Sequence, residues 1–201
     1  MPAMSVRPQN AQSTEAYYHV LVSLVLVPLG CAAVAAGWML FAMLSLRMSV
    51  GSVPASLPDG YFLLPLVVGG LLFLPMYWLS QRLNACRVML TLLLLQWSLL
   101  AWLGAAQHRW EFLLIGVVLG VTGGIVSAGI AHIYAWAPQS WSGVVVGVYG
   151  AIMAGGGLAW LLVPIISLAY SWRIAVWSLM LPVFMVILLL WLFIEPDAGR
   201  I

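Results

Sequence analysis

The sequence has very little charge. Only 6% of its 201 residues are Asp, Glu, Lys or Arg, and lysine is absent altogether. Because charged residues make up about 25% of an ordinary soluble domain, this composition excludes a water-soluble globular protein. The charges sum to +2 and are dispersed along the chain, which excludes a nucleic-acid-binding surface. We therefore expect no nucleic-acid partner.

Cysteine is also scarce, with one residue at Cys31 and one at Cys86. Their wide separation matches neither a metal-binding motif nor the disulfide framework of a secreted domain, so we interpret them as unrelated thiols. The polar residues 1–16 contain no basic region followed by a short apolar core and a cleavage site. These residues predict a short polar tail, not a signal peptide.

Apolar residues dominate the rest of the chain. They make up 65% of the sequence, and the mean hydropathy is +1.11. Since a bilayer-spanning helix needs about 20 apolar residues, the chain has room for about six. We predict an all-α, polytopic membrane protein with the lipid bilayer as its solvent. Charges and Pro/Gly turns place the predicted spans at residues 17–46, 61–79, 88–106, 112–136, 143–169 and 174–194, followed by a short tail at 195–201. We expect a loop at Ser49–Gly60 and an interruption at Ala137–Ser142. The short polar turn Ser80–Arg87 predicts that the second and third spans form a tight helical hairpin.

The arginines and aromatic residues indicate orientation and span ends. An even number of spans places both termini on one side. Trp and Tyr residues at the predicted ends fit the aromatic belts of a membrane protein. The chain suits a bacterial inner membrane with both termini cytoplasmic. In that orientation Arg7, Arg82, Arg87 and Arg200 are inside, while Arg47, Arg109 and Arg173 are outside.

Glycine recurs at helical spacing in two of the spans. Gly116, Gly120 and Gly124 lie four residues apart, and Gly143 with Gly147 repeats that spacing. Such spacing exposes bare backbone along one face of a helix. Two interpretations stay open: close packing within one bundle, or a gating or substrate-facing helix.

Four stretches, taken in order, resemble the amino-terminal six-helix half of a major facilitator superfamily transporter, nearest the nitrate/nitrite porter branch. Gly69–Pro75 leading into Ser80–Arg87 is similar to the second helix and the turn that follows it. Gly116 to Pro138 is similar to the glycine-rich fourth helix. Gly143 to Pro164 is similar to the fifth, and Tyr170–Arg173 to the turn before the sixth. The resemblance implies half of a major-facilitator-type bundle.

The chain departs from that pattern where the resemblance implies charge. Phe73 stands where the porters place the arginine that holds the anion, and an aromatic ring cannot replace a guanidinium group. Gln81 stands in place of an aspartate in the turn after the second helix. An asparagine expected in the fifth helix aligns with Tyr149 or Met153.

The polar residues inside the predicted spans supply hydrogen bonds but no fixed charge. His132 is the one histidine within a span, and a structural role competes there with a proton relay. A site built from all three histidines would need distant helices to converge, so we expect no metal and no cofactor. No catalytic set lies in a plausible cleft, so we expect no enzyme. The polar candidates are Thr91, Gln96, Ser98, Thr122, Ser127, His132 and Tyr149.

Two functional hypotheses follow. The first is a degenerate half-transporter that acts as a non-catalytic structural, assembly or accessory subunit of a larger membrane complex. The second is a transporter of a small solute or anion, nitrate/nitrite-like, that works as a homodimer or with a separate second half. An unrelated six-helix protein is the third alternative. Both main hypotheses predict another membrane polypeptide or a second copy as partner, on a partner- or cavity-facing surface formed by Phe73, Gly120, Gly124, Ser127, His132 and Tyr149.

Overall fold

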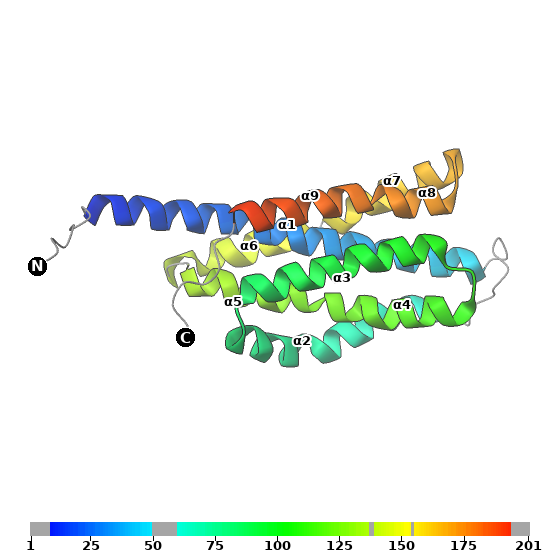
Figure 1. Cartoon of the computed structure of the whole chain (residues 1–201), viewed down its shortest axis with the longest axis horizontal. Coiled ribbons are helices and arrows are strands. Elements are labelled where there is room, and N and C mark those ends of the chain that lie inside the picture. Colours follow the sequence, from blue (N-terminus) through cyan, green and yellow to red (C-terminus); the bar gives the residue numbers. More distant parts are fainter. Residues whose placement is uncertain (1–8, 50–59, 137–138, 154, 194–201) are drawn as a thin grey trace, which may run out of the picture.

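The computed structural model describes residues 9–49, 60–136, 139–153 and 155–193. Every regular element in these ranges is helical, which confirms the all-α class for this part of the chain. The elements are α1 (Gln9–Ser49), η1 (Tyr61–Leu63), α2 (Leu64–Arg82), α3 (Ala85–Ala105), α4 (Arg109–Thr122), α5 (Gly124–Trp136), η2 (Gln139–Trp141), α6 (Ser142–Met153), α7 (Gly155–Ala169), α8 (Trp172–Ser178) and α9 (Met180–Phe193). Figure 1 shows them lined up along one long axis.

Within these ranges, five segments are long and apolar enough to cross a membrane. They are Leu21–Ser45, Tyr61–Arg82, Ala85–Ala105, Arg109–Tyr134 and Trp172–Phe193. The chain is therefore an integral membrane protein of the polytopic helical type.

The predicted fifth span, residues 143–169, is divided between α6 and α7, and residue 154 between them lies outside the described residues. Figure 1 shows α6 and α7 one after the other along the bundle, from the end where α5 finishes to the end where α8 begins. The count of six spans stays a prediction.

The helix ends differ from the predicted span ends by a few residues. α1 already begins at Gln9, inside the stretch predicted as a polar tail, because Gln9–Ala16 contains good helix formers and neither Pro nor Gly. The predicted loop at 49–60, the tail at 195–201 and the Ala137–Pro138 interruption fall largely or wholly on residues outside the described ranges. The first described residues of α1 and the last of α9 lie at the same end of the bundle (Figure 1).

Side-chain caps set several helix starts. The Asn84 side chain accepts a hydrogen bond from the Cys86 N–H at 3.1 Å, so α3 begins three residues before the predicted span. At α4, a Glu111 carboxylate oxygen accepts from the Gln107 N–H at 2.6 Å and the His108 N–H at 3.0 Å. Ser171 caps α8 by accepting from the Ile174 N–H at 3.3 Å. These caps satisfy amide groups that the helix itself leaves unpaired.

α1 lies at the centre of the bundle and packs against α5, α6, α7 and α9. α2 packs along α4 and α5, while α3 packs on the other side of them. The sequence predicted that the second and third spans form a tight hairpin. The turn between them is indeed short, but the hairpin is wrong, because α4 and α5 separate α2 from α3 over most of their length.

Candidate functional site

Glycines of α4 and α5 form a stripe that other helices cover. A Cβ added at Gly120 would lie 2.5 Å from Val68 Cβ, and one at Gly124 would lie 2.7 Å from Met76 Cγ, both on α2. Real Cβ atoms do not approach so closely, so these contacts require glycine. We call Gly116, Gly120, Gly123, Gly124 and Gly129 the inner stripe, because each of them meets a side chain from another helix. For this stripe the structure favours the close-packing interpretation.

Trp38 of α1 is partly buried and packs against the inner stripe at Gly123. Its indole ring lies against Gly69 and Gly123, where an added Cβ at either position would clash with ring carbons. Its Nε1–H donates a 2.8 Å hydrogen bond to the Leu119 carbonyl oxygen. The ring is thus held by shape on two faces and by a hydrogen bond at its edge.

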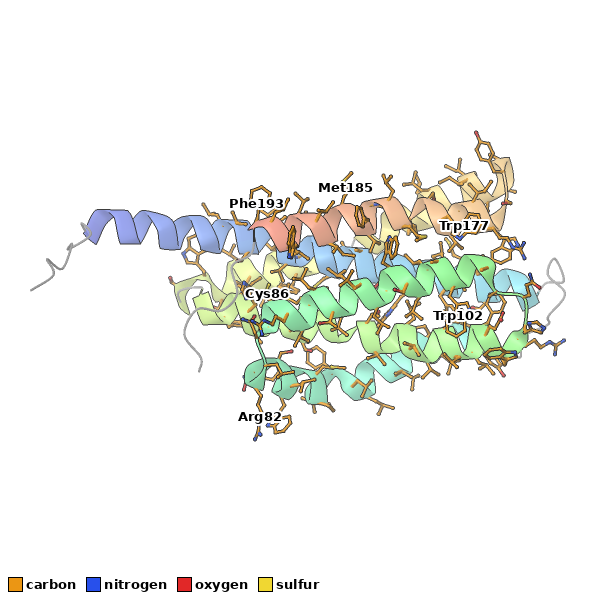
Figure 2. All side chains as sticks on the ribbon, in the orientation of Figure 1. Arg82, Cys86, Trp102, Trp177, Met185 and Phe193 are labelled. Atoms are coloured by element: carbon orange, nitrogen blue, oxygen red, sulfur yellow. The ribbon has the colours of Figure 1, made fainter. Side chains whose placement is uncertain are left out.

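The glycines of α6 are arranged differently. Gly143, Gly147 and Gly150 lie three or four residues apart, and a Cβ added at any of them would meet nothing within 4 Å. Their neighbour Val146 is 64% exposed. We call these three glycines the outer stripe. On α9 the exposed face instead carries bulky side chains, and Figure 2 shows Met185 and Phe193 pointing away from the bundle.

His132 of α5 is buried in the interior and bonded to α1. Its Nε2 lies 3.2 Å from the Ser23 hydroxyl oxygen, across 109 residues of sequence, and only 1% of the residue is exposed. Whether Ser23 donates or accepts depends on the ring tautomer. This bond joins the first and fourth spans, and its geometry serves the structural role that the sequence allowed for His132.

Two further polar groups, the Tyr149 hydroxyl and the Cys31 thiol, lie one to two helical turns after Ser23 along α1. The buried Tyr149 hydroxyl of α6 lies against Gly129 and Val27, so closely that an added Cβ at Gly129 would clash with it. The Cys31 thiol of α1 donates to the Ile125 carbonyl oxygen of α5 over 4.0 Å. Ser23, Val27 and Cys31 follow at intervals of four residues, which places them on one face of α1. The face toward α5 and α6 is therefore a partly polar seam.

Gln96 crosses from α3 to α1 near the middle of its span. Its Nε2 donates a 2.7 Å hydrogen bond to the Ala33 carbonyl oxygen, and Gly37 leaves room for the amide. The residue is fully buried, yet its Oε1 atom has no hydrogen-bond partner in the described structure. Such a group costs roughly 1–3 kcal/mol where it stays unsatisfied.

Charged residues lie at the ends of the spanning segments. Arg82 is the last residue of α2 and its guanidinium lies 4.0 Å from the Trp78 ring centroid, while Arg87 is in the first turn of α3. Arg109 and Glu111 begin α4. Among the described residues, no group of three or more His, Cys, Asp or Glu side chains could hold a metal ion. The interior of the spans thus offers neutral hydrogen-bonding groups.

The six predicted site residues do not share one open surface. Phe73 lies on the outside of α2 and is 38% exposed, with no cation beside it in the middle of that helix. Gly120, Gly124 and Ser127 are covered by this chain's own helices. His132 and Tyr149 lie on the seam with α1. A partner- or cavity-facing role for these residues stays a prediction, and in the described chain five of the six are buried.

Sequence reasoning missed Ser23, Cys31 and Trp38 as members of this interior. The four-residue spacing of Ser23 and Cys31 on one helix face was a signal for a shared seam. Trp38 stands several residues inside its span, away from the interfacial belts where tryptophan collects, which indicates a specific interior role. Of the polar candidates that were named, Thr91 and Ser98 are exposed.

Two curated proteins are similar to this chain. The nitrite extrusion protein of Bacillus subtilis (strain 168) is 27% identical over 142 residues, which is 69% of this chain and 36% of that protein. The probable nitrate transporter NarT of Staphylococcus aureus (strain MRSA252) is 25% identical over 138 residues, again 69% of this chain and 36% of that protein. No protein-family model matches the chain.

The matched region is thus about a third of the length of the curated relatives. Both relatives carry names that describe the movement of nitrate or nitrite. Over about 69% of its length, this membrane protein resembles the nitrate/nitrite porters of the major facilitator superfamily.

Proposed function

We propose that this chain forms one half of a transporter for a small anion of the nitrate or nitrite type and works together with a second helical half. The observation that carries the proposal is the similarity to two proteins named for nitrite extrusion and nitrate transport. Since the chain matches only about a third of each relative, the activity and the partner are inferred for an assembly, not for this chain alone.

The outer stripe supports the need for a second half. Lipid chains pack poorly against bare glycine backbone, whereas another helix can approach it closely. Among the described residues, no side chain packs against Gly143, Gly147 or Gly150, while the bulky outer face of α9 suits lipid. We therefore place the second half, or a second copy, against α6.

Because the interior of the described spans is neutral, we infer that the partner carries the cation that binds the anion. An anion that leaves water needs a cation or several strong donors, since neutral hydrogen bonds alone do not replace its hydration shell. In the described part of the chain the arginines lie near the helix ends, and Phe73 is an apolar surface residue in mid-helix. The binding cation would then come from the second half.

One observation favours a different role. The phenyl ring of Phe73 stands where the resembled porters have an arginine, and this is the reason for the hypothesis of a non-catalytic structural or accessory subunit. In that role the outer stripe would dock onto a larger complex and no solute would pass. The chain would keep the porter bundle only as a scaffold.

Reconstitution distinguishes these roles. The chain is purified from native membranes in mild detergent, once as the intact complex and once alone, and each is placed in liposomes for nitrite and nitrate uptake. We expect uptake by the complex and none by the chain alone. A complex that contains a second polypeptide but moves neither anion supports the accessory role. Saturable uptake by the chain alone contradicts the need for a partner.

A further inference from the structure

The fourth span is interrupted close to its middle. α4 ends at Thr122 and α5 begins at Gly124, within the continuous apolar segment Arg109–Tyr134. At the junction the Gly123 N–H bonds to the Gly120 carbonyl oxygen at 3.1 Å, and the Val126 N–H bonds to Gly123 O at 3.1 Å. Both bonds reach back three residues where an α-helix reaches back four. Short stretches of this kind within a helix often mark a hinge.

An interruption between α8 and α9 has an ordinary cause. Between α8 and α9, Pro182 lacks an N–H and its ring would clash with the Ser178 carbonyl, so the helix breaks at Leu179. There is no proline in α4 or α5. A break without proline needs a glycine pair or a group inserted into the hydrogen-bond ladder. Gly123–Gly124 supplies the pair, and Trp38 supplies the group.

Trp38 donates a hydrogen bond to the carbonyl oxygen that loses its helical partner at the break. In a regular α-helix the Leu119 oxygen would accept from the Gly123 N–H. Here it accepts from Trp38 Nε1 at 2.8 Å and from the Thr122 hydroxyl at 2.6 Å. The indole ring also fills the space beside Gly123, where a Cβ would clash with it. One side chain therefore both satisfies the freed acceptor and lies beside the break.

We propose that Trp38 is a positioning residue that holds the fourth span broken at Gly123, and that this junction is a hinge about which α5 changes its angle to α4. Loss of the indole N–H leaves Leu119 O with the Thr122 hydroxyl alone and lets the Gly123 N–H return to it. The α-helical hydrogen bonding then continues across the junction, and the angle between α4 and α5 changes. A use of this hinge in solute passage rests on the proposed function, but the hinge itself does not.

The hinge is tested on the full chain in lipid nanodiscs, without solute or partner. In a Cys31→Ala, Cys86→Ala background, spin labels are placed at Tyr134, near the end of α5, and at Leu192, near the end of α9; both side chains are exposed. α5 has 13 residues, so a 20° rotation about its start would move its end by roughly 6 Å. Electron–electron double resonance resolves such a shift.

We expect Trp38→Phe, which keeps an aromatic ring but lacks the donor, to move or split the distance distribution by several ångströms. Replacement of Trp38 by benzothienylalanine, which keeps nearly the full volume of tryptophan without the N–H, isolates the hydrogen bond if the Phe variant folds poorly. Trp97→Phe is the matched control, since the Trp97 ring lies 6.1 Å from Phe184 on α9. We expect its distribution to match the parent.

Hydrogen exchange adds a local readout: amide exchange across residues 119–126 should change in both Trp38 variants and not in the Trp97 variant. Unchanged distances and exchange in both Trp38 variants would show that the indole only fills space, and an equal change in the control would show a general loosening. Either result overturns the hinge. Neither of these two results tests the proposed transport function, because that function is tested separately by anion uptake into liposomes that contain the complex.

Discussion

Both glycine stripes contain glycines three or four residues apart in the sequence, but their surroundings in the structure are opposite. Every member of the inner stripe lies against a side chain from another helix, with Phe41, Val68 and Met76 among the contacts. The three members of the outer stripe meet nothing within 4 Å. Glycine spacing therefore predicts that a helix face is meant for close approach, but not which chain supplies the approaching helix.

One face of α6 packs inside the bundle and its opposite face is open. Its inward face sends Tyr149 onto Gly129 of the inner stripe, and its outward face carries Gly143, Gly147 and Gly150. The inward contact anchors the helix to α1 and α5. The outward face is then presented by a fixed helix, which is what a docking surface for a second half requires.

Alanine at Gly120 should have the largest effect on stability. Its Cβ would lie 2.5 Å from Val68 Cβ and 3.0 Å from the Pro65 carbonyl oxygen, so α2 must move away. We expect a loss of about 1–3 kcal/mol in the free energy of unfolding, measured by SDS titration in micelles. The matched control is Gly147→Ala in the outer stripe, where we expect little change or a gain of up to about 1 kcal/mol. Equal losses at the two positions would erase the distinction between the stripes.

Alanine at Gly129 should show a coupling between the inner stripe and Tyr149 of α6. The added Cβ would clash with the Tyr149 hydroxyl and lie 2.5 Å from a Val27 methyl group. Tyr149→Phe removes the first clash but not the second. In a double-mutant cycle we therefore expect Tyr149→Phe to recover part of the loss, with a coupling energy of roughly 0.5–3 kcal/mol. If the stability losses of Gly129→Ala and Tyr149→Phe were simply additive, the Tyr149 hydroxyl would not lie against Gly129.

Alanine at Ser23 should have the smallest effect. It removes the hydrogen bond to His132 and leaves one ring nitrogen without this partner. Because interhelical hydrogen bonds in membranes are worth about 0.6 kcal/mol on average, we expect a loss near that value. The measurement is the same SDS titration, with the exposed Ser98 changed to alanine as control. A loss of several kcal/mol would indicate a polar network larger than the Ser23–His132 pair.

The five membrane-length segments of the described chain overlap five of the predicted spans, and the reason for the overlap is physical. Charged and turn residues at Arg82, Gln107 and Arg173 end apolar runs wherever they occur, so the span ends needed no tertiary information. The helix-to-helix contacts did need it. The Ser23–His132 bond joins residues 109 positions apart, and no local pattern indicates which helices meet.

The break at Gly123 shows a second limit. Gly120 and Gly124 read equally well as part of one continuous helix, and the partner that holds the break, Trp38, lies 81 residues from Leu119. The predicted α2–α3 hairpin was wrong for a related reason, because a short turn brings two helices together only if no other helix packs between them. Adjacency in sequence does not decide adjacency in a bundle.

The central claim is that a second polypeptide or a second copy covers the outer stripe in the native membrane. In a Cys31→Ala, Cys86→Ala background, one cysteine is placed at Gly147, and in a matched variant at Leu181 on the outer face of α9, which is 68% exposed. A membrane-permeant maleimide is applied in native membranes and to the chain purified alone. The account predicts that Gly147→Cys is protected in membranes and reacts after purification, while Leu181→Cys reacts in both. Equal labelling of the two positions in native membranes would contradict it.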